Sequence, residues 1–340
     1  MAMARQIGMA ACPALLWCLV ATASLLDRLI GDPLSCFHPV QALGWLISRC
    51  RALLEPPCRG HPAGLGLAGL AITLLVSAGA VLAGHALERL TLLWPAVGLP
   101  LLLAGLASCL AGRSLRDAVE AVLALLRCDA LEAARCQLAR VVGRDVNQLD
   151  RSEILRALAE TASENAIDGA FAPLFWMLLG AALWGLGFPL GPLALGWGFK
   201  AASTLDSMLG YRQGNLRWLG TSAARLDDVL VWLPCRLAAL TVALLSKQPT
   251  LACMARATRE ARSDPSPNAG LSEAIYANAL GMALGGTNRY GTQLVHKPLL
   301  GQGHPPPGEA DVLACLRMTR AGLTSWLLIS LAIVLTVCLG

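Results

Sequence analysis

Long apolar runs alternate with polar blocks along this chain of 340 residues. Six runs come close to the roughly 20 apolar residues that a helix needs to cross a bilayer, or exceed that length. They are residues 8–26, 63–84, 92–112, 170–199, 229–245 and 322–340. This pattern predicts an all-α fold, a polytopic membrane helical bundle in which residues 1–340 form a single membrane-embedded domain.

Two of the runs allow a second interpretation. The first, 8–26, contains the Ala-Thr-Ala sequence of a signal-peptidase site at residues 21–23. We interpret it as a retained span, because the polar motif directly after it reads as functional. The run 229–245 has 17 residues and includes Pro234 and Arg236, so it is either a span or a re-entrant segment.

The run 170–199 is too long for one simple span, because 30 helical residues extend about 45 Å. The sequence Gly-Phe-Pro-Leu-Gly-Pro at 187–192 interrupts it. The run is therefore either one irregular span or a hairpin of two shorter helices.

Basic residues give the predicted sidedness. Four polar blocks, 27–62, 113–168, 200–228 and 246–321, hold 24 of the 27 Lys and Arg residues. The positive-inside rule then places all four on the cytoplasmic side of a cell (inner) membrane, provided that 170–199 folds back and 229–245 does not cross. If both runs cross instead, 200–228 lies outside.

Composition supports a membrane protein and excludes other classes. The chain is 56% hydrophobic and 14% charged, whereas soluble domains are about 25% charged. The 12 cysteines show no C-x-x-C or zinc spacing and read as small buried residues in a reducing compartment. The net charge of +5 fits basic cytoplasmic loops and needs no nucleic-acid partner.

An acidic helix is predicted to begin near Asp150, with Glu153 completing a capping box and Gly169 ending the helix. Carboxylates at 153, 160, 164 and 168 then share one face. Like charges repel at this spacing. The face is therefore solvated, paired with arginines, or bound to a divalent cation that carries phosphates.

Other local patterns predict caps and turns. Arg113 to Leu126 reads as an amphipathic helix, and Asp129 with Glu132 as a second capping box that opens a helix to about Val142. Ser272 is expected to cap a helix after the turn at 261–271. Residues 85–91 are expected to link two spans, and 298–308 to form a loop.

Three further motifs carry candidate chemistry. Asp32-Pro33 and His38-Pro39 would present an acid and an imidazole from a non-helical loop, unless the motif is only a turn. The glycine-rich stretch 284–291 allows a close approach to phosphate, although packing is the simpler reading. The blocks also contain carboxylates beside Arg and Lys, a combination that suits Mg²⁺–phosphate chemistry. The chain has no P-loop, H-E-x-x-H or G-x-S-x-G motif.

The order of these strings resembles the adenosylcobinamide-phosphate synthase family of cobalamin biosynthesis. The strings are GDP and HPV, AETASENAIDGAFAPLFW, TLDSMLGYR, ARLDDVL, PSPNAG and LGG, between about Asp27 and Arg320. The resemblance implies an integral membrane ligase that uses ATP to join aminopropanol, as its O-phosphate or free, to a propionate carboxyl of adenosylcobyric acid. It also implies ATP and Mg²⁺ as the substrate complex, and other cobalamin-assembly enzymes are candidate partners.

Site residues follow from the same resemblance. The expected catalytic residues are His38, Glu160, Glu164, Asn165, Asp168 and Asp206, with His38 or Asp206 as the base. Substrate and phosphate binding is expected at Asp32, Lys200, Tyr211, Arg212, Arg225, Ser266 and Asn268. Metal binding is expected at Glu164, Asp168, Asp227 and Asp228.

Three departures from the family pattern concern substrate contacts. Ser203 stands where the family has Asn, Asp264 where it has His, and Gln213-Gly214 where it has Asn-Glu. A transporter for a corrinoid or a small anion is the alternative function. Its charges should lie inside the spans, and here Arg236 is the main charge that does. A scaffold for other enzymes would not need carboxylates and cations in four blocks.

Overall fold

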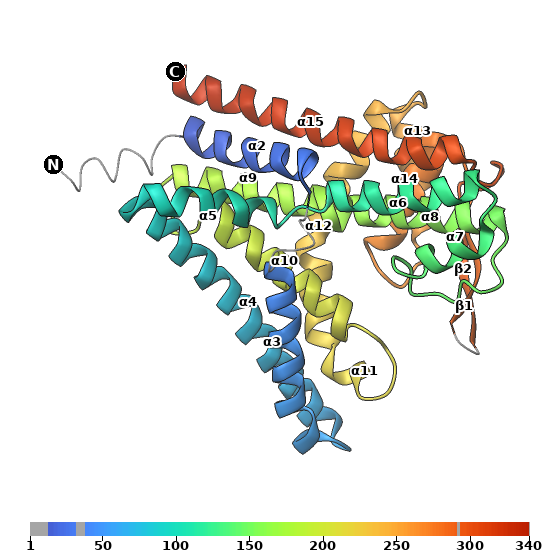
Figure 1. The fold of residues 1–340 in the computed structure, drawn as a ribbon, viewed down its shortest axis with the longest axis horizontal. Helices are drawn as coiled ribbons and strands as arrows, with labels where there is room; N and C mark the ends of the chain where they lie inside the picture. The colour runs from blue at the N-terminus through green and yellow to red at the C-terminus, as the bar shows by residue number, and fades with distance from the viewer. Residues whose placement is uncertain (1–12, 32–37, 291–292, 340) are drawn as a thin grey trace. The chain divides into compact units, whose positions relative to one another are not determined.

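The computed structural model describes residues 13–31, 38–290 and 293–339. The described chain is predominantly helical (Figure 1), which confirms the prediction of an all-α membrane bundle. Within these described residues, four helices are long and apolar enough to cross a membrane, or five if one bent pair is a single span. The chain forms two compact units, which we describe separately. Unit 1 comprises residues 1–111, 172–230 and 326–340, and unit 2 comprises 112–171 and 231–325.

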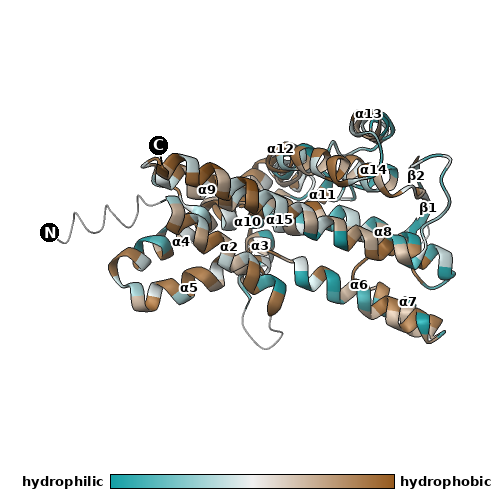
Figure 2. Ribbon diagram, turned by 90° about the horizontal axis from the view of Figure 1, so that it is seen from above, coloured by the Kyte–Doolittle hydropathy of each residue, from teal (hydrophilic) through white to brown (hydrophobic). Residues whose placement is uncertain are grey.

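Unit 1 is built from apolar helices, and Figure 2 shows hydrophobic residues along most of α4, α5 and α9. Its elements are α2 (Pro13–Leu29), α3 (Pro39–Leu54), η1 (Pro56–Cys58), α4 (Pro62–Leu93), α5 (Pro95–Ala107), α9 (Ala172–Gly185), α10 (Pro192–Leu209) and α11 (Leu216–Leu219). Two further helices, α12 (Thr221–Leu245) and α15 (Glu309–Leu339), have residues in both units.

Helices α3, α4 and α10 enclose the unit 1 core, where Ile47, Ile72 and Leu205 are fully buried. Gly84 lets α4 and α10 approach closely, because a Cβ there would lie 2.8 Å from the Cα of Ala194. Glu88, one turn further along α4, is buried at the start of α10. Its Oε1 accepts the N–H groups of Leu193 at 2.6 Å and Ala194 at 3.1 Å.

The run 170–199 forms a helical hairpin. Helices α9 and α10 pack against each other, with Gly180 close to Gly191 and Met177 close to Gly196. Later residues of α9 therefore meet earlier residues of α10, as in an antiparallel pair. The Pro/Gly interruption of the apolar pattern marks the turn between them.

Unit 2 carries more polar residues. Its elements are α6 (Gly112–Arg127), α7 (Leu131–Leu138), α8 (Arg151–Ala166), η2 (Ile167–Phe171, a π-helical turn), α13 (Thr250–Ala261), α14 (Ala269–Leu280), β1 (Leu284–Tyr290) and β2 (Gln293–Leu300). The strands pair antiparallel, with Gly286 opposite Lys297 and a register shift between Leu284 and Gly286. Helix α8 packs against α6, α7, α14 and β1.

The capping box on α8 is confirmed, because Asp150 accepts from the N–H of Glu153 and Glu153 accepts from that of Asp150. The amphipathic helix predicted at 113–126 is α6. The prediction that the helix ends at Gly169 was wrong. The chain continues through the π-helical turn into α9, since Gly169 lies within a buried run that packing keeps helical.

Three other local predictions were also wrong. Ala130 and not Asp129 precedes α7, which ends at Leu138, and Asp129 has a positive φ of 53°. Ser272 lies inside α14, which starts after Asn268. Residues 85–91 belong to the continuous helix α4. The loop expected at 298–308 is confirmed from residue 301 to 308, and its first three residues belong to β2.

Candidate active site

The predicted site residues fall in both units. Unit 2 contains Glu160, Glu164, Asn165, Asp168, Ser266 and Asn268. Unit 1 contains His38, Lys200, Asp206, Tyr211, Arg212, Arg225, Asp227 and Asp228. Asp32 lies outside the described residues.

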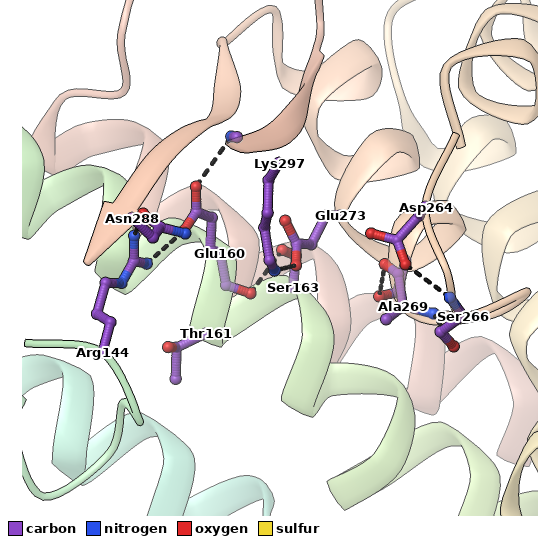
Figure 3. Close-up of polar contacts among 12 residues, drawn as sticks. Arg144, Glu160, Thr161, Ser163, Asp264, Ser266, Ala269, Glu273, Asn288 and Lys297 are labelled. Atoms are coloured by element: carbon purple, nitrogen blue, oxygen red, sulfur yellow. Dashed lines mark hydrogen bonds and ion pairs between the residues drawn. The ribbon is translucent and has the colours of Figure 1, made fainter. Parts of the chain in front are cut away.

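Glu160 is the centre of the polar contacts in unit 2 (Figure 3). It lies in the third turn of α8, and 3% of its surface is exposed. Its Oε2 accepts from Arg144, and its Oε1 accepts from Arg156 at 3.2 Å and from the N–H of Gly285 at 2.9 Å. Both carboxylate oxygens therefore accept hydrogen bonds from the protein, three in all, which favours a positioning role over metal binding.

Two arginines form ion pairs with Glu160 and connect α8 to the β-hairpin. Arg144 also donates to the side-chain oxygen of Asn288 on β1. Arg156 donates to the carbonyl oxygens of Gly285 and Thr287, and to Asn288 at 3.2 Å. We call these residues, Arg144, Arg156, Glu160, Gly285 and Asn288, the Glu160 cluster.

A second buried ion pair joins α14 to β2. The ammonium of Lys297 lies 3.0 Å from Oε1 of Glu273, whose residue is 1% exposed. Burial raises the pKa of Glu273 to about 8, and the Glu164 and Glu160 charges act in the same direction against the opposing effect of Lys297. The pKa of Lys297 is also raised, because the nearby carboxylates outweigh the loss of hydration. Both Glu273 and Lys297 therefore keep their protons to a higher pH than exposed residues of the same types.

The remaining acidic residues of α8 and η2 are more open. Glu164, one turn beyond Glu160, is partly exposed and lies within electrostatic reach of Lys297 and Asp264. In the described chain no hydrogen bond reaches its carboxylate. Asp168 lies in the π-helical turn and is partly exposed. Asn165 is exposed and donates to the Thr161 carbonyl at 3.0 Å.

The Pro-rich turn before α14 is held by its own polar side chains. Asp264 Oδ1 accepts from the N–H of Ser266 at 2.9 Å, and Ser266 Oγ accepts from the N–H groups of Asn268 and Ala269 at 3.3 Å. Arg236 of α12 donates to Asn268 Oδ1 at 3.0 Å and to the Pro267 carbonyl at 3.3 Å. Arg236 was the main charge within a predicted span and so the residue most compatible with a transporter. In the structure it holds the turn before α14.

In unit 1 the predicted residues occupy several places. His38 caps α3, with its Nδ1 accepting from the N–H of Val40 at 3.3 Å. Lys200 and Asp206 are partly buried on α10, and Asp227 and Asp228 are partly buried on α12. Tyr211, Arg212 and Arg225 are exposed.

Glu55 organises the loop that carries Tyr211 and Arg212, and sequence reasoning missed it. Its Oε1 accepts from Asn215 at 3.0 Å and its Oε2 from Arg51 at 2.7 Å. These hydrogen bonds, first that from Asn215, lower the pKa of Glu55. The carboxylate is therefore charged at neutral pH and anchors the end of the loop.

Among the described residues, no group of three or more His, Cys, Asp or Glu side chains is arranged to hold a metal ion. An Mg²⁺ ion that is bound to phosphate commonly takes only one or two protein carboxylates beside phosphate oxygens and water. Glu164 and Asp168 are the more open carboxylates of α8 and η2 that could supply them.

Sequence reasoning also missed Arg144, Glu273, Asn288 and Lys297. Two signals could have found the ion pair. Glu273 is an acid within a run of mostly apolar residues, and Lys297 is one of only three lysines among 27 Lys and Arg residues. Nothing in the local pattern indicates that Asn288 meets Arg144.

Comparisons with known proteins agree over most of the chain. A family model described as "CobD/Cbib protein" matches residues 20–319. A cobalamin biosynthesis protein CobD from Synechocystis sp. is 40% identical over 322 residues, covering 94% of this chain and 92% of the relative. The cobalamin biosynthesis protein CbiB of Salmonella typhimurium is 35% identical, with 89% and 92% covered. The CobD protein of Klebsiella pneumoniae is 35% identical, with 94% and 95% covered. No solved structure matches.

Proposed function

This chain belongs to the CobD/CbiB family of cobalamin biosynthesis proteins, and from that premise we propose that it is an ATP-dependent amide ligase. It would join aminopropanol, as its O-phosphate or free, to a propionate carboxyl of adenosylcobyric acid. The product would be adenosylcobinamide or its phosphate. The reaction would take place at a cell membrane, with the polar blocks on the cytoplasmic side.

The proposed chemistry has two steps. A propionate oxygen attacks the γ-phosphorus of ATP, the bond to the β–γ bridging oxygen breaks, and ADP leaves with that electron pair. The amine nitrogen then attacks the acyl carbon, inorganic phosphate leaves, and a proton passes from nitrogen to a base. This route is needed because a carboxylate is a poor acyl donor and the anionic reactants repel each other.

The observation that carries the proposal is the gathering of α8 carboxylates and buried cations in unit 2. Arg144, Arg156 and Lys297 supply positive charge within one small region. Glu164 lies within electrostatic reach of Lys297 and Arg144, and Asp168 follows it in η2. Cations stabilise the charge of a transferring phosphoryl group. We propose that Glu164 and Asp168 hold the Mg²⁺ that arrives with ATP, where it would neutralise phosphate charge.

The test is a mass-spectrometric assay with detergent-purified protein. The reaction contains adenosylcobyric acid, ATP, Mg²⁺ and aminopropanol phosphate, with free aminopropanol in a parallel reaction. The informative variant combines Glu164→Gln with Asp168→Asn. The matched control is Glu132→Gln, which removes an acid whose side chain is 83% exposed.

A product with the mass of the amide, dependent on ATP and lost only in the double variant, is the expected result. Full activity in the double variant would support the ligase function but show that Glu164 and Asp168 are not part of its active site. No product from folded wild-type protein with either amine would contradict the proposal. His38→Ala and Asp206→Asn variants in the same assay test the predicted base.

A further inference from the structure

The β-hairpin places one lysine at an unusual position in unit 2. Only Lys200, Lys247 and Lys297 are lysines among the 27 Lys and Arg residues. The structural ion pairs of Glu160 and Glu55 use arginine, whose planar fork suits bidentate bonding. Lysine presents a compact, mobile point charge instead, which suits contact with an oxyanion that arrives and leaves.

The backbone directs Lys297 towards Glu273 and the region of Glu164. Gly285 has a φ of +84°, and a Cβ there would lie 1.9 Å from the carbonyl oxygen of Pro298. Gly285 lies at the register shift between Leu284 and Gly286, next to the Gly286–Lys297 pair. Figure 3 shows the Lys297 side chain extending from β2 to Glu273. The register therefore fixes where the ammonium lies.

Exposure differs sharply between the two partners. The Glu273 side chain is 2% exposed, whereas that of Lys297 is 28% exposed. The carboxylate is therefore closed to solvent, whereas part of the lysine side chain is open to it. Burial raises the pKa of Glu273, so its carboxyl offsets the lysine charge less completely than an exposed carboxylate would.

We propose that Lys297 is the oxyanion-binding residue of the unit 2 site, with buried Glu273 as the positioning residue that holds its ammonium. The ligand is a phosphoryl or carboxylate oxygen of an anionic substrate, and Glu164 is the neighbouring carboxylate that limits its affinity. The assignment to a substrate rests on the proposed ligase function. The oxyanion comes from the terminal phosphate of ATP or from the corrinoid propionate, and the test separates these sources.

The first measurement is equilibrium binding, which requires no turnover. Detergent-purified protein is titrated with inorganic pyrophosphate in EDTA, with a non-hydrolysable ATP analogue plus Mg²⁺, and with adenosylcobyric acid. Lys297→Met should weaken binding of pyrophosphate and of one of the two substrates by about tenfold or more. Lys247→Met, which removes an exposed lysine of the same chain, should change none of the three affinities.

Glu164→Gln provides a second variant with an effect of opposite sign. Removing its charge beside Lys297 should tighten pyrophosphate binding about fivefold in EDTA, since like charges at short range cost about 1 kcal/mol even where solvent screens them. This variant decides the matter if Lys297→Met does not fold. Unchanged or weaker binding by Glu164→Gln would then overturn the proposal.

Folded Lys297→Met that binds all three probes within twofold of wild type would also overturn it, as would wild-type protein that binds none of them. If the wild type binds the probes through Lys297 but forms no amide, the anion site stands and the ligase assignment fails. In an active enzyme, the KM for the substrate bound at Lys297 should rise in Lys297→Arg, while the KM for the amine stays unchanged.

Discussion

At the scale of single residues, unit 2 balances buried charges of opposite sign. Glu160, Glu164 and Glu273 face Arg144, Arg156 and Lys297. Removing one member of a buried pair is costly because its partner stays desolvated and uncompensated. Single charge substitutions should therefore change stability strongly and in predictable directions.

Glu160→Gln tests the balance at the carboxylate that accepts from Arg144, Arg156 and Gly285. The amide cannot neutralise Arg144, whose side chain is 6% exposed. We expect the free energy of unfolding to fall by about 3 kcal/mol, measured by denaturant titration in detergent. Glu132→Gln removes an acid at the surface and should have little effect. Equal stability of the two variants would contradict the positioning role of Glu160.

Glu273→Gln tests the raised pKa. Folding raises the pKa of Glu273 from 4.5 to about 8, so its stabilising contribution is complete below pH 4.5 and is lost as the pH rises through 8. Wild-type protein should therefore lose stability relative to Glu273→Gln between these pH values. Thermal unfolding at several pH values measures the difference, and parallel curves for the two proteins would show that Glu273 does not titrate there.

Sequence reasoning proposed Glu160 as a catalytic residue and arginines as partners of the acidic face, but it did not find Arg144 or Gly285 as its partners. The Glu160 carboxylate meets Gly285, 125 residues away, and Arg144, 16 residues away. Local spacing indicates which face of a helix a residue occupies, but long-range packing decides what it meets. Glu273 and Lys297 escaped notice for the same reason, since their pairing depends on the register of a hairpin.

At the scale of elements, local signals succeeded where they were strong. The capping box at Asp150 and the amphipathic period of 113–126 predicted the starts of α8 and α6. The hairpin was missed because Leu284–Tyr290 contains two glycines and no regular alternation of apolar and polar residues. Gly169 was a misleading stop signal, because burial on every side keeps the π-helical turn helical.

Gly285→Ala tests how far the hairpin depends on its glycine. Both its positive φ and the contact with Pro298 oppose a Cβ, so we expect a loss of about 2 kcal/mol or more in unfolding free energy. Gly303→Ala is a matched control, because Gly303 has a φ of +88° and a Cβ added there would meet no atom within 4 Å. Its cost should be smaller, and an equal cost would assign the whole effect to backbone strain.

At the scale of the whole molecule, composition and run length were sufficient to predict a helical membrane protein. They did not predict where each helix begins and ends, since α4 continues through residues 85–91, which were expected to link two spans. The resemblance of ordered motifs supplied the family, and the comparisons confirmed it. The reaction itself is a proposal, because the geometry of a polar cluster is compatible with many substrates and only turnover identifies one.

The contact between Glu88 and the start of α10 has a consequence for how the chain is made. During translation, Glu88 leaves the ribosome roughly 105 residues before the Leu193 amide that it binds. Its helix must therefore enter the insertion machinery with a carboxylate that lacks its final hydrogen-bond donors. A nascent chain that stops after Leu186 should be degraded faster in a pulse-chase experiment than one that stops after Leu209. Glu88→Leu should reduce that difference, and equal lifetimes of the two unmodified chains would show that insertion does not wait for α10. On this view, the first half of the protein becomes stable in the bilayer only when the α9–α10 hairpin has been synthesised.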